Sequence, residues 1–155
     1  MVKRRKKTPR QKIIDRLDAL WRKIDSETQV CEVCATLPPE EQVRHSKIDN
    51  HHIIGRGNKL LRWDLRNRCK LCSRHHTLGN PCAEKNQDGW FLNRFSDEDW
   101  MGKNRPEDKK YLLEREHQTK KWSMFELREL EKHMKELLKN PKAGEYFDAV
   151  VDALS

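Results

Sequence analysis

Two pairs of adjacent histidines are the side chains of this sequence best suited to chemistry. His51 and His52 form one pair, and His75 and His76 form the other, directly after a Cys-x-x spacing. The unperturbed pKa of an imidazole is about 6.5, so at cellular pH it is mostly neutral and can bind a metal ion or accept a proton. A single histidine is usually an ordinary surface or core residue. Two pairs on either side of Asn67 instead indicate a site for a divalent metal ion and acid–base chemistry.

Four of the five cysteines are spaced as metal ligands. Cys31 and Cys34 form one Cys-x-x-Cys pair, and Cys69 and Cys72 form a second. An odd number of cysteines at this spacing favours a metal site over disulfides. Two tetrahedral zinc sites are consistent with the residues: Cys31, Cys34, Cys69 and Cys72, or Cys31, Cys34, Cys72 and His75. Either set of four protein ligands leaves no open position, so the zinc would be structural.

Composition describes a small protein that can draw stability from a metal ion. The chain has 155 residues, of which 35% are hydrophobic, so we expect one domain with appendages and a modest core. No apolar run is long enough to cross a membrane, and the basic start is not followed by an apolar segment. We therefore expect no secretory signal, no membrane attachment and a cytoplasmic location.

The net charge of +8 is concentrated in two segments. Residues 1–30 carry ten basic against four acidic residues, and residues 44–74 carry nine against two. By contrast, residues 122–155 carry five against seven. The second basic segment contains the first histidine pair, so the charge predicts a polyanionic partner such as a phosphate backbone. Residues 1–8 read as a basic disordered arm.

The elements that would position the histidines can be read in outline. A helix is expected from residue 9 to about 25, within an N-terminal helical segment 9–28, because Thr8-Pro9 is a helix start. Short β structure is expected over 43–54, where adjacent side chains such as His51 and His52 point to opposite sides. A helix that begins near Cys72 would carry the second histidine pair as far as Asn80-Pro81. Another helix would run to about 94, and Cys82 would be a core residue.

Residues 96–155 read as a helical scaffold. The sequence predicts a helix from Pro106 to about 118 and another that starts at a capping box, Ser123 to Glu126, and ends at Asn140-Pro141. A last short helix would cover 144–154. The apolar stripes of the N-terminal and C-terminal helices are expected to form core, although their heptad-like spacing could instead form a dimer seam.

At residues 49–76 the chain resembles the HNH (ββα-metal) endonuclease family. The match consists of a histidine pair before an aliphatic pair, a central asparagine and a histidine on the following helix. Within the family the chain resembles the phage NinG-type recombination nucleases through Arg62-Trp63-Asp64-x-x-Asn67 and Glu114-x-x-x-Gln118-x-x-Lys121-Trp122-Ser123. The implied fold class is α+β and mostly helical. It has a zinc-stabilised ββα-metal (HNH) core at 29–95, with flanking N- and C-terminal helices.

The resemblance also implies roles for single residues. Counting from Asn67, it favours a structural Zn²⁺ held by Cys31, Cys34, Cys72 and His75, which leaves Cys69 as a buried neighbour. It places His51 and His76 on a catalytic divalent ion (Mg²⁺, Mn²⁺ or another transition metal), with Asp49 and Asn80 as further candidate ligands. His52 would be the general base for a water molecule. The amide of Asn67 would hydrogen-bond the loop that presents His52.

The resemblance therefore predicts a metal-dependent DNA endonuclease that acts on branched recombination intermediates in the cytoplasm of a phage-infected host. An HNH nuclease that nicks or cuts duplex DNA without junction preference is the alternative within that class. A non-catalytic zinc module that binds nucleic acid is the alternative from another class. Arg56, Arg62 and Arg66 are candidates for phosphate contacts. A two-fold symmetric junction would favour a homodimer.

Overall fold

The computed structural model describes residues 6–24, 30–42, 47–140 and 144–154, and its chain divides into two compact units. The first unit combines Met1–Asp25 with Lys120–Ser155, and the second is Ser26–Thr119. Most of the predicted basic arm, residues 1–5, lies outside the described residues. The second unit contains both histidine pairs, and residues 96–119 belong to it as well. The expected boundary at residue 95 therefore does not coincide with a division between the units.

Three helices form the first unit: α1 (Pro9–Lys23), α5 (Met124–Lys139) and α6 (Gly144–Leu154). The hydroxyl of Thr8 accepts a hydrogen bond from the Gln11 N–H, and Pro9 occupies the first turn of α1, as the sequence predicts. The capping box is also present, with Ser123 and Glu126 each bonding the backbone of the other.

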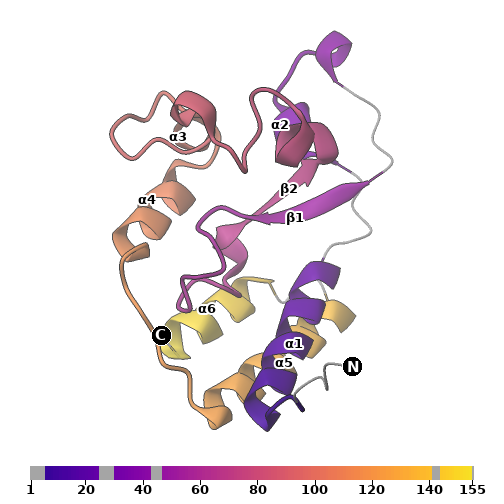
Figure 1. Ribbon diagram of the computed structural model, residues 1–155, viewed down its shortest axis with the longest axis vertical. Helices are drawn as coiled ribbons and strands as arrows, with labels where there is room; N and C mark the ends of the chain where they lie inside the picture. Colours follow the sequence, from indigo (N-terminus) through magenta and orange to yellow (C-terminus); the bar gives the residue numbers. More distant parts are fainter. Residues whose placement is uncertain (1–5, 25–29, 43–46, 141–143, 155) are drawn as a thin grey trace, which may run out of the picture. The chain divides into compact units, whose positions relative to one another are not determined.

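Helices α1 and α5 lie side by side within one chain (Figure 1). Their buried residues are Ile13, Leu17 and Trp21 on α1, and Leu127, Leu130, Met134 and Leu137 on α5. Burying each such side chain contributes about 1.5–3 kcal/mol before entropy is counted. These stripes are therefore core, and the same residues do not remain exposed to form a dimer seam.

The second unit contains a two-stranded antiparallel sheet. β1 (Ile48–His52) pairs with β2 (Arg68–Cys72), with His51 opposite Cys69 and His52 opposite Arg68. The strand lies inside the predicted β segment 43–54, of which residues 43–46 are outside the described residues. The unit also contains helical elements: α2 (Glu32–Ala35), a π-helical turn at Arg74–Leu78, α3 (Trp100–Asn104) and α4 (Pro106–Arg115). Of these, α2 and the turn pack against β2. The described chain is thus α+β and mostly helical, as predicted.

The prediction of a helix from about residue 80 to 94 is wrong. This stretch is made of turns, with a single 3₁₀ segment at Gln87–Gly89. Asn86 and Asp88 adopt positive φ angles of 45° and 53°, which a right-handed helix does not allow. The Asn86 side-chain oxygen also accepts the N–H groups of Phe91 and Leu92, each at 3.1 Å. This local bonding replaces the helical pattern.

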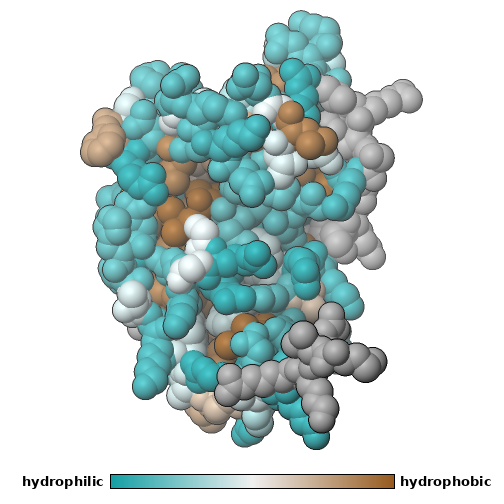
Figure 2. All heavy atoms as spheres, in the orientation of Figure 1, coloured by the Kyte–Doolittle hydropathy of each residue, from teal (hydrophilic) through white to brown (hydrophobic). Residues whose placement is uncertain are grey.

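The surface agrees with the polar composition. Hydrophilic residues cover most of the face drawn in Figure 2, as a mean hydropathy of −1.07 leads one to expect. Within the described residues, no helix combines the length and apolar character that crossing a bilayer requires.

Candidate metal centre

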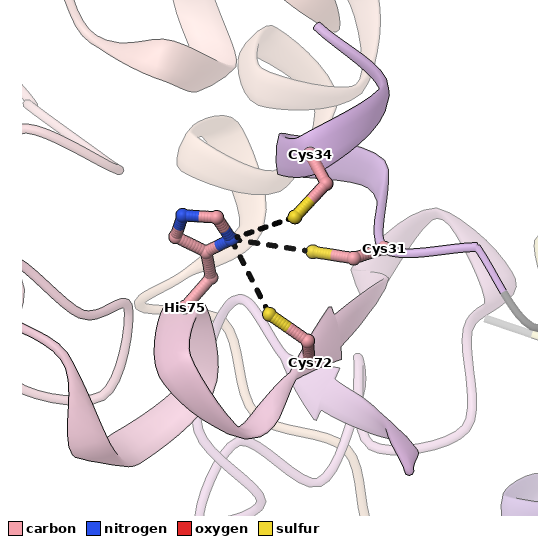
Figure 3. A group of neighbouring side chains, drawn as sticks. All are labelled: Cys31, Cys34, Cys72 and His75. Atoms are coloured by element: carbon pink, nitrogen blue, oxygen red, sulfur yellow. Dashed lines mark hydrogen bonds between the residues drawn. The ribbon is translucent and has the colours of Figure 1, made fainter. Parts of the chain in front are cut away.

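Three cysteines and a histidine converge in the second unit (Figure 3). Cys31 immediately precedes α2 and Cys34 lies within it. Cys72 ends β2, and His75 belongs to the turn that follows. All four residues are buried, and their ligand atoms lie within 4.8 Å of one another. A knuckle, a strand end and a helical turn from distant parts of the sequence therefore present one set of metal-binding atoms.

The distances in this group fit a tetrahedral ion. Nδ1 of His75 lies 3.4 Å from each of three sulfurs, those of Cys31, Cys34 and Cys72. One ring nitrogen carries a single proton or a single lone pair, so it cannot form three hydrogen bonds at once. Tetrahedral zinc, with bonds of about 2.3 Å to sulfur and 2.0 Å to nitrogen, would set these separations at roughly 3.6 Å. The four residues could hold a structural metal ion, and their donor set suits zinc.

Cys69 stands outside this group although it is fully buried. Burial raises the pKa of its thiol well above the ordinary value, which keeps the thiol protonated. At Cys31, burial also acts to raise the pKa, but hydrogen bonds from His75 and from the Cys72 and Cys34 backbones outweigh it and lower the pKa to about 6. The three-cysteine, one-histidine set is therefore the one that the fold assembles. Cys82 is buried, as predicted for a core residue.

The outer edge of β2 is held by an ion pair. Glu32 accepts the N–H of Lys70 at 2.8 Å, and Arg105 donates to the carbonyl of Arg68 at 2.5 Å. Glu32 and Arg105 also pair with each other at 3.3 Å. Because Glu32 lies between the two cysteines of the knuckle, this clamp fixes the knuckle against the strand that ends at Cys72.

A second polar group contains His51, His76 and Asp49. Residues 49 and 51 lie on the same side of β1, because side chains alternate along a strand. The rings of His51 and His76 are edge to face, with centroids 5.2 Å apart. Oδ2 of Asp49 lies 3.4 Å from Nδ1 of His76. Strand β1 and the turn that follows β2 thus bring together three of the predicted ligands of the catalytic ion.

This group is looser than the cysteine centre. Among the described residues, Cys31, Cys34, Cys72 and His75 are the only set of three or more His, Cys, Asp or Glu residues whose ligand atoms all lie within 4.8 Å. Asn80, the other predicted ligand, is exposed and lies beyond the end of the turn at Leu78. The predicted extra helical turn that would carry Asn80 back toward His76 is absent.

The surroundings of His51 keep it uncharged. Burial and the neighbouring His76 and His52 lower the pKa of His51 to about 4. The ring of Phe91 packs edge to face against His51, with centroids 5.7 Å apart. Phe91 in turn stacks on Trp100 at 5.4 Å. A neutral imidazole has a lone pair available, which is the state a metal ligand requires.

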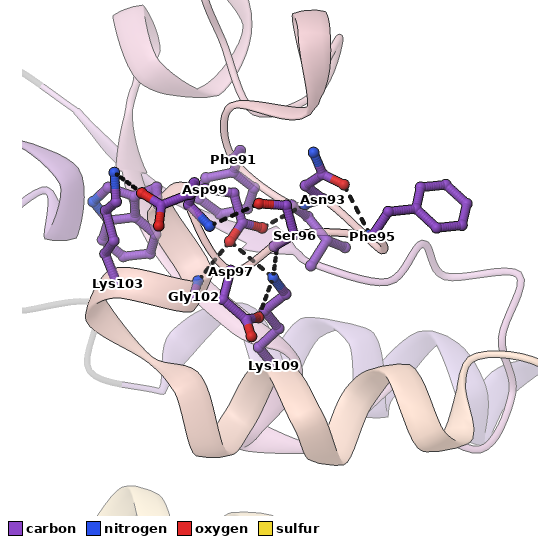
Figure 4. Close-up of polar contacts among 12 residues, drawn as sticks. Phe91, Asn93, Phe95, Ser96, Asp97, Asp99, Gly102, Lys103 and Lys109 are labelled. Carbon is purple, nitrogen blue, oxygen red and sulfur yellow. Dashed lines mark hydrogen bonds and ion pairs between the residues drawn. The ribbon is translucent and has the colours of Figure 1, made fainter.

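A buried lysine holds the segment that carries Phe91 (Figure 4). Nζ of Lys109 donates to the Ser96 carbonyl at 2.7 Å, to Asp97 at 2.8 Å and to Asp99 at 2.9 Å. Asp99 also accepts the N–H groups of Asn93 and Gly102. A Cβ at Gly102 would collide with Asp97 and Asp99, so this position requires glycine. Residues 96–155 were predicted to be a helical scaffold, and no motif in the sequence indicated that Lys109 holds the segment that packs against His51.

His52 points to the other side of β1 from His51. Its Nε2 lies 2.9 Å from the carbonyl oxygen of Arg62, so Nε2 carries the proton that is donated. Asn67 is fully buried and bonds the loop after β1: its Oδ1 accepts from Ile54 N–H at 2.6 Å, and its Nδ2 donates to the carbonyls of Ile54 and Leu61. This amide makes the kind of loop contact that the resemblance implies for it.

The three predicted phosphate-binding arginines lie in different environments. Arg56 is exposed in the turn after β1. The guanidinium of Arg62 lies over the Trp63 ring, 5.4 Å from its centroid. Arg66 is held by the buried Asp64 at 2.9 Å and by the Tyr111 hydroxyl at 2.7 Å. Arg66 is therefore part of the internal structure of its unit, which the sequence did not indicate.

Comparisons with protein-family models, with curated proteins and with solved structures find no match to this chain.

Proposed function

We propose that this protein is a metal-dependent DNA endonuclease of the HNH type. The observation that carries the proposal is the grouping of His51, His76 and Asp49 beside the Cys₃His centre, with their imidazoles 5.2 Å apart. A zinc module that only binds nucleic acid needs the cysteine centre. Such a module does not need a second group of two histidines and a carboxylate next to the cysteine centre.

His51, His76 and Asp49 would hold the catalytic divalent ion. Imidazole and carboxylate donors suit Mn²⁺ and other transition metals, and the carboxylate also suits Mg²⁺. Because the three ligand atoms do not lie within 4.8 Å of one another, the side chains would draw together on binding. When bound there, such an ion would supply stabilisation of the negative charge on the scissile phosphate and on the leaving oxygen.

His52 would act as the general base. An imidazole that donates its Nε2–H to the Arg62 carbonyl has, when neutral, its lone pair on Nδ1. The carbonyl therefore selects the tautomer and the ring orientation. Glu32 and Arg105 bond the outer edge of β2. Because the sheet has two strands, β1 forms its other edge. A phosphate at the β1 edge could meet side chains from both faces of the strand.

The reaction follows from these assignments. Nδ1 of His52 takes a proton from a water molecule while the water oxygen forms a bond to phosphorus. The bond between phosphorus and the 3′ oxygen breaks, and that oxygen takes a proton from solvent. The products are a 5′-phosphate and a 3′-hydroxyl. Asn67 would act as a positioning residue, because it bonds the backbone two residues beyond His52.

The test is His52→Ala, with cleavage of plasmid DNA, DNA affinity and zinc content measured on the same preparation. We expect cleavage to fall to near background while DNA binding and zinc content stay unchanged. His117→Ala is the matched control, because His117 is 90% exposed and belongs to the same unit. Cleavage at the wild-type rate in His52→Ala would remove His52 as the base. If the wild type cleaves no DNA with any divalent ion tried, the result would instead support the alternative, a non-catalytic zinc module.

The substrate is tested separately. The NinG-type residues lead us to propose branched DNA, and a four-way junction and its matched linear duplex can be cut side by side. Faster cleavage of the junction is expected. Equal rates would support the alternative, an HNH nuclease without junction preference.

A further inference from the structure

Every lysine and arginine of α5 lies on one face of the helix. Arg128, Lys132, Lys135 and Lys139, here called the basic stripe, follow one another at intervals of four, three and four residues. At 3.6 residues per turn, these positions fall within an arc of about 60°. All four side chains are exposed, whereas the apolar face of α5 is buried against α1. The four cations are separated by acidic residues in the sequence, but the helix places them side by side on one face.

Burial of the apolar face places the charged residues of α5 toward solvent, but it does not require that one face carry only cations among its exposed residues. Like charges three and four residues apart are neighbours on a helix and repel one another. In the part of the chain that the structure describes, Lys135 is the one member of the stripe with an ion pair, to Glu131 at 2.8 Å. Glu131 is also bound by two nitrogens of Arg16, at 2.8 and 3.0 Å. Because Glu131 is shared between Lys135 and Arg16, it does not fully neutralise Lys135, and the basic stripe keeps a net positive charge.

A hollow of about 300 Å³ opens among these side chains. It is lined by the four cations of the basic stripe and by Glu131 and Glu136. Arg16 of α1 donates to both carboxylate oxygens of Glu131, so one of the two acids is already paired with a cation outside the stripe. The remaining charge in the hollow favours an anion, and the hollow has room for a phosphate group.

We infer that the basic stripe binds the phosphodiester backbone of DNA. From residue 128 to 139 the helix rises about 16 Å, and one strand of duplex DNA carries a phosphate about every 3.4 Å along the axis. Four cations over that length can therefore each meet a phosphate of one strand. The choice of DNA as the polyanion rests on the proposed function. The stripe extends that function by assigning a substrate contact to the first unit, whose C-terminal segment is acidic overall.

The experiment measures the affinity for a short fluorescent duplex by anisotropy, in buffer without added divalent ion, at salt concentrations of about 50 to 200 mM. The stripe variant is R128Q/K132Q/K135Q/K139Q. Glutamine keeps a good helix propensity, so α5 should remain folded, and circular dichroism checks this. If each cation meets a phosphate, the slope of log affinity against log salt should fall by about 3 to 4. A fall smaller than about 2 would overturn the inference.

A variant of equal net charge separates local binding from general electrostatics. K85Q/K103Q/K110Q/K121Q removes four exposed lysines that lie outside α5. We expect its slope to stay closer to that of the wild type, and a fall equal to that of the stripe variant would also overturn the inference. Because the readout is binding, it does not depend on cleavage. The inference that the stripe binds DNA can therefore be supported even if no nuclease activity is found. It can also be rejected even if the protein is an active nuclease.

Discussion

The side-chain amide of Asn67 satisfies both backbone groups of Ile54. Its Oδ1 accepts the Ile54 N–H at 2.6 Å, and its Nδ2 donates to the Ile54 carbonyl at 2.9 Å. The same Nδ2 donates to the Leu61 carbonyl at 3.0 Å. Because Ile54 comes two residues after His52, these bonds fix the chain where it leaves β1. These bonds therefore add to the strand pairing with Arg68 and the bond to the Arg62 carbonyl in holding His52 in place.

Replacing Asn67 with alanine should destabilise the second unit. The buried N–H and carbonyl of Ile54 would lose their side-chain partner, at a cost of about 1–3 kcal/mol each, so we expect a loss of roughly 2 kcal/mol or more. Urea unfolding followed by fluorescence measures this change. Asn104→Ala is the control, because Asn104 is exposed, and it should change stability by less than about 0.5 kcal/mol. Equal unfolding midpoints for the two variants would contradict the assigned role.

The metal content distinguishes the two cysteine sets. Native mass spectrometry should find one zinc ion per chain in the wild type and in Cys69→Ala, but none in Cys34→Ser. The reason is that Cys34 belongs to the Cys₃His group whereas Cys69 does not. Addition of a strong chelator should lower the melting temperature of the wild type. Loss of zinc from Cys69→Ala would instead favour the four-cysteine site.

Lys109→Met should weaken the packing around Phe91. Lys109 is 3% exposed and donates to Ser96, Asp97 and Asp99, so its loss would leave the buried carboxylate of Asp99 without its cation. Breaking a buried pair in this way costs about 3–5 kcal/mol. Thermal or urea unfolding tests the expectation, with the exposed Lys110→Met as the matched control. A variant as stable as the control would show that the three hydrogen bonds contribute little.

Acid should weaken the contact between α1 and α5. Hydrogen bonds from Arg16 and then from Lys135 lower the pKa of Glu131 to about 2 despite its burial. Since the pKa is lower in the folded state than its usual 4.5, this stabilisation is complete above about pH 4.5 and is lost as the pH falls toward 2. Melting temperatures measured between pH 6 and pH 3 should fall less for Arg16→Gln than for the wild type. Parallel curves would mean that the pair does not couple to folding.

Local patterns in the sequence were sufficient for several elements. Thr8-Pro9 and the capping box at Ser123 bond backbone groups within four residues, so sequence spacing alone determines them. The alternation along a strand likewise places His51 and His52 on opposite sides without reference to the rest of the chain. The same local reasoning failed over 80–94, because the side chain of Asn86 bonds backbone groups that a periodicity argument does not consider.

The amino-acid sequence by itself therefore determined the metal-binding residue types, the paired histidines and the ends of the longest helices, because these follow from spacing of a few residues. Residue spacing alone left Cys69 and His75 as alternatives, the family resemblance favoured His75, and the tertiary structure groups His75 with Cys31, Cys34 and Cys72. The tertiary structure alone placed Phe91 against His51, committed Arg66 to Asp64 and drew the cations of α5 into one stripe. Those relationships depend on which faces of distant segments meet, and burial and charge pairing decide that only when the whole unit has folded.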